Sequence, residues 1–119
     1  MRVVISATGK DINDLMDVRF GRCRYFQIHD TETGEFRVLE NEGQKSGGGA
    51  GIAAAQQIID EGVDVVITGS LGPNAFDLIN KAGIKAYKCN EMRIKEVIDK
   101  FKNGELEEIN MAGPAHHGM

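Results

Sequence analysis

The sequence predicts one α/β domain, and three observations lead to that fold class. Apolar runs of strand length alternate with helical patterns in the second half of the chain. Of the 119 residues, 41% are hydrophobic and 27% are charged, which is the composition of a folded domain with a single core. Glycine contributes 15 residues, about twice its average share of roughly 7%, and stands where loops and helix ends are expected.

Three strands are expected in the first half of the chain. Residues 3–5 form an apolar run without alternation, which is typical of a strand buried on both faces. Residues 25–29 alternate between apolar and polar side chains, so His29 is expected on an exposed, polar face. A third strand covers residues 36–39. Between these two, Gly34 can take the positive φ that a hairpin turn requires.

The second half alternates helices with strands. The glycine-rich stretch 43–51 leads into a first helix, and apolar strands are expected over 63–68 and 84–88. Helical spacing of apolar residues defines three amphipathic helices. Their expected buried faces are Ile52, Ala55, Ile58 and Ile59 in the first helix, Phe76, Leu78, Ile79 and Ala82 in the second, and Ile94, Val97, Ile98 and Phe101 in the third.

The helix ends carry their own signals. Gly62, Gly83 and Gly104 each follow a helical pattern, where a left-handed residue commonly ends the helix. Pro73 suits the first position of the second helix, because its missing N–H would be unpaired there in any case. Asn90 is expected to cap the third helix.

The element order β-β-β-α-β-α-β-α restricts the topology. Right-handed crossovers make the later strands parallel, and the two short connections at the start make strand 2 antiparallel. A five-stranded mixed sheet in the order 3-2-1-4-5 satisfies both conditions, as in ribonuclease H-like folds with three layers. We expect one domain over residues 1–110 and an aperiodic tail over 111–119.

This topology brings several loops to one edge of the sheet. The order reverses between strands 1 and 4, the switch point at which open α/β sheets bind ligands. Two helices begin at this edge, so their unpaired N–H groups favour an anion. The segments expected here are 8–9, 19–24, 46–51, 69–74 and 89–90.

Composition excludes some functions. A net charge of −4 gives no support for a nucleic-acid partner, and no apolar run approaches the roughly 20 residues needed to cross a membrane. The apolar stretch at the N-terminus is too short for a secretory signal. We therefore expect a cytoplasmic protein in which Cys23 and Cys89 are reduced thiols.

Three motifs resemble those of the dinitrogenase iron–molybdenum cofactor biosynthesis family. They are DVRFGRC at 17–23 followed by Tyr25-Phe26, GGGAGIAAAQ at 47–56, and GSLGPNAF at 69–76. The resemblance covers residues 1–110 and includes NifX-type accessory proteins and the C-terminal part of NifB. It implies a ribonuclease H-like fold and a protein that carries or stores an iron–sulfur or molybdenum–iron–sulfur cluster without catalysis. Cluster donor and acceptor proteins are then expected partners, and the chain is expected to be a monomer or a weak dimer.

The resemblance implies Cys23 as a metal ligand, within the RFGRC motif. Neighbouring arginines would favour both a thiolate and an anionic cluster. Cys89 is a second candidate, although strands 2 and 5 are about three spacings apart, roughly 14 Å, which is too far for one metal ion to bridge both thiols. His116 and His117 are candidate ligands from the tail. The candidate binding residues are Arg19, Arg22, Gly47, Gly48, Gly49, Gly69, Ser70, Gly72 and Asn74.

Other interpretations stay open. Cys23 is also explained as an inert core residue, the glycines as a flexible linker and ordinary turns, and the tail as a disordered terminus. Arg19 and Arg22 could instead form salt bridges with Asp14 or Asp17. A regulatory module that binds a nucleotide or small anion would use the same loops. A thiol-dependent enzyme would use Cys89, but no His is placed as its base. A two-metal nuclease is improbable, because the first strand carries no carboxylate.

Overall fold

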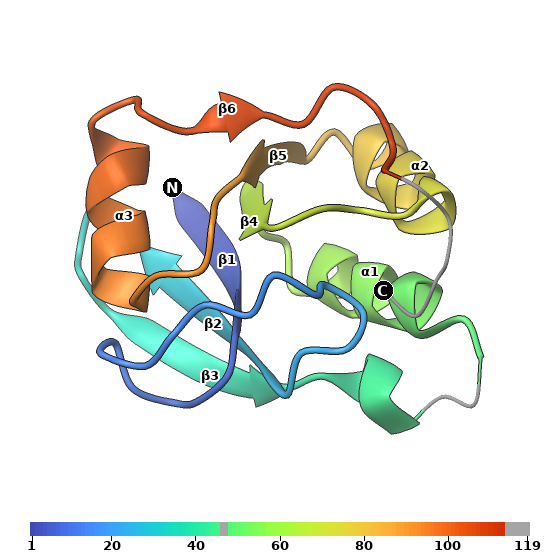
Figure 1. Cartoon of the computed structure of the whole chain (residues 1–119), viewed down its shortest axis with the longest axis horizontal. Coiled ribbons are helices and arrows are strands. Elements are labelled where there is room, and N and C mark those ends of the chain that lie inside the picture. Colours follow the sequence, from blue (N-terminus) through green and yellow to red (C-terminus); the bar gives the residue numbers. More distant parts are fainter. Residues whose placement is uncertain (46–47, 114–119) are drawn as a thin grey trace.

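A mixed sheet forms the middle of the molecule in the computed structural model, which describes residues 1–45 and 48–113 (Figure 1). The strands take the order β3-β2-β1-β4-β5-β6. β2 is antiparallel to β1 and β3, whereas β1, β4 and β5 are parallel, so the predicted order and directions of five strands are confirmed. The strands are β1 (Arg2–Ala7), β2 (Tyr25–Asp30), β3 (Phe36–Glu40), β4 (Val65–Thr68), β5 (Lys85–Lys88) and β6 (Glu107–Glu108).

The predicted count of five strands is wrong, because β6 adds a sixth at the edge. Glu107 and Glu108 pair antiparallel with Lys88 and Tyr87. Both glutamates are exposed and do not alternate with apolar residues, so the local sequence pattern does not predict a strand here. The β5 edge supplies the missing backbone partners and creates the strand.

Helices cover both faces of the sheet, as expected for three layers (Figure 1). α1 (Ala50–Asp60) and α2 (Pro73–Lys81) lie on one face, α3 (Ile94–Lys102) lies on the other, and the short η1 (Glu42–Lys45) precedes α1. Alternate residues of each central strand enter the two resulting cores. In β1, Val4 packs on the α1–α2 side, and Val3 and Ile5 pack on the α3 side.

The predicted helix ends are mostly confirmed. Gly62, Gly83 and Gly104 follow the three helices with φ of 70°, 78° and 71°, the left-handed region that glycine tolerates best. Pro73 opens α2. The predicted cap at Asn90 is wrong, because α3 begins four residues later, after an extended Arg93 that makes no side-chain cap.

The expected buried face of α1 is wrong at Ile52. The helix buries Ala50, Ala54, Ala55 and Ile58 instead, and Ile52 is 44% exposed. Small residues let α1 and α2 approach closely: a Cβ added at Gly51 would lie 3.6 Å from Ala75 Cβ. In α2 the buried residues are Ala75 and Ile79, Phe76 and Leu78 are half-buried, and Ala82 is exposed against expectation.

Three glycines let the loops beside the sheet touch through their backbones. A Cβ at Gly69 would lie 2.5 Å from Val18 Cβ, and one at Gly43 would lie 2.5 Å from the Ala50 oxygen. A Cβ at Gly21 would lie 2.9 Å from the Gly51 nitrogen. Real Cβ atoms do not approach other heavy atoms so closely. Glycine at these positions therefore permits close packing between the segments.

The expectation that His29 is exposed is wrong, because the side chain is only 4% exposed. Gln27 Nε2 donates to the carbonyls of Gly9 and Asp11, which brings the loop after β1 over this face. The Gln27 oxygen then accepts from His29 Nε2 at 2.9 Å. The imidazole also stacks on Phe36 with ring centres 4.7 Å apart. Burial lowers the pKa of His29 to about 4.

This buried imidazole predicts a pH-dependent stability. The unfolded chain protonates His29 near pH 6.5, whereas the folded protein resists protonation until about pH 4. The free energy of unfolding should therefore fall as the pH drops from 6.5 to 4, by up to about 3 kcal/mol. Urea unfolding at pH 7, 5.5 and 4 measures this, and His29→Gln should show a smaller fall. An equal fall in the variant would assign the effect to other groups.

The glycine contacts predict two different outcomes for one kind of substitution. Gly69→Ala should lower the free energy of unfolding by about 1–3 kcal/mol, since the new methyl group collides with Val18. Gly72→Ala is the matched control, because no atom lies within 4 Å of its Cβ position and φ is −68°. Thermal unfolding of both variants measures the difference. Equal midpoints would contradict the packing role of Gly69.

Candidate functional site

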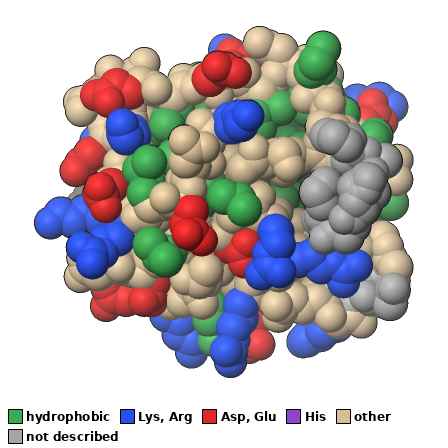
Figure 2. Space-filling view, viewed as in Figure 1, with side chains coloured by type: hydrophobic (Ala, Val, Ile, Leu, Met, Phe, Trp, Pro, Cys, Tyr) green, Lys and Arg blue, Asp and Glu red, His purple; other side chains and the backbone are tan. Residues whose placement is uncertain are grey.

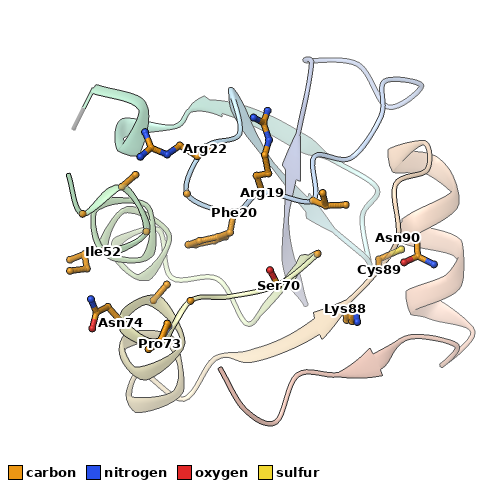
Figure 3. A pocket seen from close by; sticks show the side chains of 18 residues that line it. Arg19, Phe20, Arg22, Ile52, Ser70, Pro73, Asn74, Lys88, Cys89 and Asn90 are labelled. Atoms are coloured by element: carbon orange, nitrogen blue, oxygen red, sulfur yellow. The ribbon is translucent and has the colours of Figure 1, made fainter. Parts of the chain in front are cut away.

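A pocket of about 560 Å³ lies at the edge of the sheet where the sequence places the ligand (Figure 3). Four segments surround it: residues 18–22 between β1 and β2, 49–52 at the start of α1, 69–75 between β4 and α2, and 88–90 after β5. The observed strand order reverses between β1 and β4, so this is the switch point of the sheet. Its size is within the usual range of small-ligand sites.

Two helices begin at the pocket. Gly49 precedes α1 in a left-handed conformation with φ of 70°, and Gly72 precedes α2 in an extended one. Neither helix has a side-chain cap, so the first amides of both helices have no side-chain acceptor at the cap position. Asn74 and Ala75, in the first turn of α2, line the pocket. Both helix dipoles therefore contribute positive potential here.

The charged side chains of the lining are all cationic. Arg19 and Arg22 lie on one side of the pocket and Lys88 lies on the opposite side (Figure 3). Lys and Arg side chains also gather on the lower right of the face in Figure 2, near the loop between β1 and β2. Among the described lining residues there is no Asp, Glu or His. The pocket is thus electropositive in a chain whose net charge is −4.

A buried carboxylate holds one of these cations. Asp17, 6% exposed, accepts hydrogen bonds from Arg19 Nε at 3.1 Å, Arg19 Nη2 at 3.0 Å and the Arg19 backbone amide at 2.9 Å. The side-chain hydrogen bond that Arg19 donates to Asp17 raises the pKa of Arg19 above its ordinary value. The sequence names Asp17 only as an alternative salt-bridge partner of Arg19, and the structure contains that salt bridge. Its position two residues before Arg19, in the first motif, was the available signal.

The two cysteines differ in their relation to the pocket. Cys23 does not line it, is fully buried, and its thiol donates to the Phe20 carbonyl at 3.3 Å. Burial raises the pKa of Cys23 to about 12, so the thiol is protonated at neutral pH. Asn41 Nδ2 lies 3.6 Å from the same sulfur. These contacts suit a packed core residue.

Cys89 does line the pocket, next to Lys88 and Asn90 (Figure 3). Its side chain is buried, and burial raises the pKa of this thiol. A helix N-terminus would lower the pKa of this thiol, but α3 begins only at Ile94. The Cys89 thiol is therefore protonated at neutral pH.

Most of the predicted site residues meet at this pocket. Gly48 does not line it, and Gly47, His116 and His117 lie outside the described residues. Sequence reasoning missed Lys88, which ends a predicted strand directly before Cys89, and Ile52, which was assigned to the core. The predicted residues that line the pocket are Arg19, Arg22, Gly49, Gly69, Ser70, Gly72, Asn74 and Cys89.

Two kinds of feature are absent from the described part of the chain. Within residues 1–45 and 48–113, no three His, Cys, Asp or Glu side chains are grouped to hold a metal ion. No helix in the described part of the chain has the length and hydropathy of a membrane span. The described side chains thus offer charge and hydrogen bonds to a ligand, and one thiol in the lining.

Solved structures share this fold over nearly the whole chain. The apo form of the orange protein from Desulfovibrio gigas superposes with a TM-score of 0.89 at 32% identity, covering 94% of this chain and 95% of that one. A candidate NifB protein from Thermotoga superposes with a TM-score of 0.83 at 35% identity, covering 97% and 98%.

The sequence comparisons agree with these structures. An uncharacterised protein of Methanocaldococcus jannaschii is 34% identical over 100 residues, which is 82% of this chain and 85% of the relative. The family model described as dinitrogenase iron-molybdenum cofactor matches residues 1–104. The glycine-lined pocket therefore lies in a domain that this model covers almost completely, and the chain belongs to the dinitrogenase iron–molybdenum cofactor family.

Proposed function

We propose that the protein is a non-catalytic carrier for an anionic iron–sulfur or molybdenum–iron–sulfur cluster, in cofactor assembly or storage. The observation that carries this proposal is the electropositive pocket at the switch point, where three cationic side chains and two helix N-termini converge. Sulfide-bridged metal clusters are bulky anions, which suits a pocket of this size and sign. We also propose that the fold is of the ribonuclease H-like type.

The cluster would be held mainly by charge and by backbone N–H groups. Arg19, Arg22 and Lys88 supply cationic donors, and Gly72 leaves open space through which a ligand can approach the backbone. Hydrogen bonds that involve a charged partner are roughly twice as strong as neutral ones. Binding that depends on such contacts leaves the cargo free to be released intact to an acceptor.

Cys89 is the favoured thiol ligand in this proposal. Cys89 is one of the residues that line the pocket, and its buried side chain also packs in the core on the α3 side. A metal would displace the thiol proton, since metals bind the thiolate form. Cys23, which the sequence favoured, is set back in the core with a pKa of about 12. We therefore assign Cys23 a packing role beneath the pocket rather than a role in ligation.

The tail candidates have an anchor near the pocket. The Gly113 amide donates to the Leu71 carbonyl at 2.7 Å, and a Cβ at Gly113 would lie 3.6 Å from Ser70 Cβ. His116 and His117 follow this anchor within four residues, a reach of up to about 14 Å. This supports keeping both as candidate outer ligands. The division between a domain at 1–110 and a tail at 111–119 stays a prediction.

A role without catalysis is supported by the lining. The described part of the pocket contains no carboxylate or imidazole that would act as a general base. The Cys89 thiol has a raised pKa, which disfavours it as a nucleophile. The orange protein relative was solved in an apo form, which implies that it also has a loaded form. Proteins that donate and accept the cargo are the proposed partners, in the cytoplasm.

A small-anion or nucleotide module is the second candidate, because helix N-termini also bind phosphate. A nucleotide base would have to stack on Phe20, which is the aromatic residue of the described lining. A thermal shift with nucleotides, but none on cluster loading, would favour this candidate.

The carrier proposal predicts a difference between the two cysteines. Anaerobic reconstitution with iron and sulfide, with and without molybdate, should give cluster absorption in the wild type. Cys89→Ser should lose part of the bound iron, whereas Cys23→Ser should keep it, because only Cys89 lines the pocket. Metal and sulfide analysis of the desalted protein measures occupancy. No cluster absorption under any loading condition would overturn the proposal, and loss confined to Cys23→Ser would restore that residue as ligand.

Charge in the pocket predicts a second outcome. Arg22→Gln should weaken cluster retention, and raised salt should do the same, because the contact is ionic and partly exposed to solvent. Arg93→Gln is the matched control, since it removes the same charge from a residue that does not line the pocket. Cluster loss during gel filtration at 50 and 500 mM salt measures the effect. Equal loss from both variants would contradict a local role for Arg22.

A further inference from the structure

We propose that Asp17 is a positioning residue, which fixes the guanidinium of Arg19 so that one two-donor edge is presented to an anion in the pocket. This inference rests on the proposed function and adds a residue to it. Asp17 is 6% exposed and does not line the pocket, so it acts through Arg19.

The geometry of the ion pair decides which edge is free. A guanidinium has one donor edge at Nε and Nη2, and another at Nη1 and Nη2. Asp17 Oδ1 accepts from Nε and Asp17 Oδ2 accepts from Nη2, so the carboxylate occupies the first edge. In the described part of the chain, no hydrogen bond from Nη1 is found. The Nη1–Nη2 edge is therefore the one available to two neighbouring acceptor atoms of a ligand.

Asp17 is itself anchored to the centre of the sheet. Its amide donates to the Ser6 carbonyl, and its carbonyl accepts from the Ser6 hydroxyl. Because that hydroxyl proton is used, Thr68 must donate to Ser6 Oγ, at 2.8 Å. Ser6 and Thr68 are fully buried at the ends of β1 and β4. A rigid polar chain thus connects the switch point to Arg19.

The burial of Asp17 argues that the pair has a purpose beyond stability. A buried carboxylate costs free energy unless it is fully paired, and an ion pair with an exposed partner stabilises little. The Arg19 side chain is 57% exposed. What the arrangement does provide is order: a long side chain that is already fixed loses less conformational entropy when it binds a ligand.

Substitution of Asp17 separates positioning from simple charge. Asp17→Asn removes one negative charge near an anion site, so Coulomb attraction alone predicts tighter binding. Positioning predicts weaker binding, because the Asn amide nitrogen cannot accept from Nη2 and Arg19 becomes free to rotate. We expect tetrathiomolybdate, a sulfur-rich dianion with visible absorbance, to bind about threefold to tenfold more weakly, the cost of ordering one long side chain. Unchanged or tighter binding would overturn the proposal.

A double-mutant cycle tests whether the effect passes through Arg19. In an Arg19→Ala background, Asp17→Asn should no longer weaken binding. A weakening that persists there would overturn the positioning role. Arg19→Lys keeps the charge but not the two-edged geometry, and should bind about as weakly as Asp17→Asn. If Asp17→Asn does not fold, Arg19→Lys is the variant that tests the proposal. Wild-type affinity of Arg19→Lys for tetrathiomolybdate would overturn it.

A readout without ligand keeps the two proposals apart. The Arg19 Nε–H should give a protected ¹⁵N signal in the wild type, which is lost in Asp17→Asn while the backbone spectrum stays folded. An unprotected wild-type signal would overturn the positioning role. If the wild type shows the protected signal but binds neither tetrathiomolybdate nor a reconstituted cluster, the carrier function fails and the fixed geometry of Arg19 stands.

Discussion

The loops at one edge of the sheet enclose a pocket because their backbones are in contact, and glycine permits this contact at defined points. Gly69 lies against Val18, Gly21 lies against Gly51, and Gly43 lies against the Ala50 carbonyl. These contacts join segments that come from different strands and helices. Glycine is therefore a packing requirement at these three positions, whereas the open Gly72, a lining residue, gives a ligand access to the backbone.

The loops that enclose the pocket bring positive charge to it from several segments. Two helices begin at the pocket without side-chain caps, and three cationic side chains surround it. The Cys89 thiol is kept protonated by burial, and the described lining residues include no carboxylate. An anion at this lining meets cationic side chains, while the Asp17 carboxylate behind Arg19 opposes part of their attraction. The proposed anionic cargo is thus compatible with an acidic protein.

The same network connects stability with the proposed function. Ser6, Thr68 and Asp17 form a buried polar chain at the junction of β1 and β4, where the sheet order reverses. Strand ends that are fixed by hydrogen bonds provide a rigid base for Arg19. The pocket is therefore rigid on the Arg19 side, and differences in affinity among ligands should arise from how well their acceptor atoms match this fixed edge.

The sequence by itself determined the order and directions of the first five strands, the three helices, their glycine ends and the edge at which the pocket lies. Periodicity and handedness are local or topological rules, so they can be read without coordinates. Tertiary structure decided the rest. β6 exists because β5 offers a free edge, and Ile52 is exposed because alanines pack α1 more closely. His29 is buried against Gln27 and Phe36, which lie in β2 and β3. Which cysteine belongs to the pocket lining also depends on packing: both cysteines are buried, and Cys89, not the Cys23 of the motif, is a lining residue.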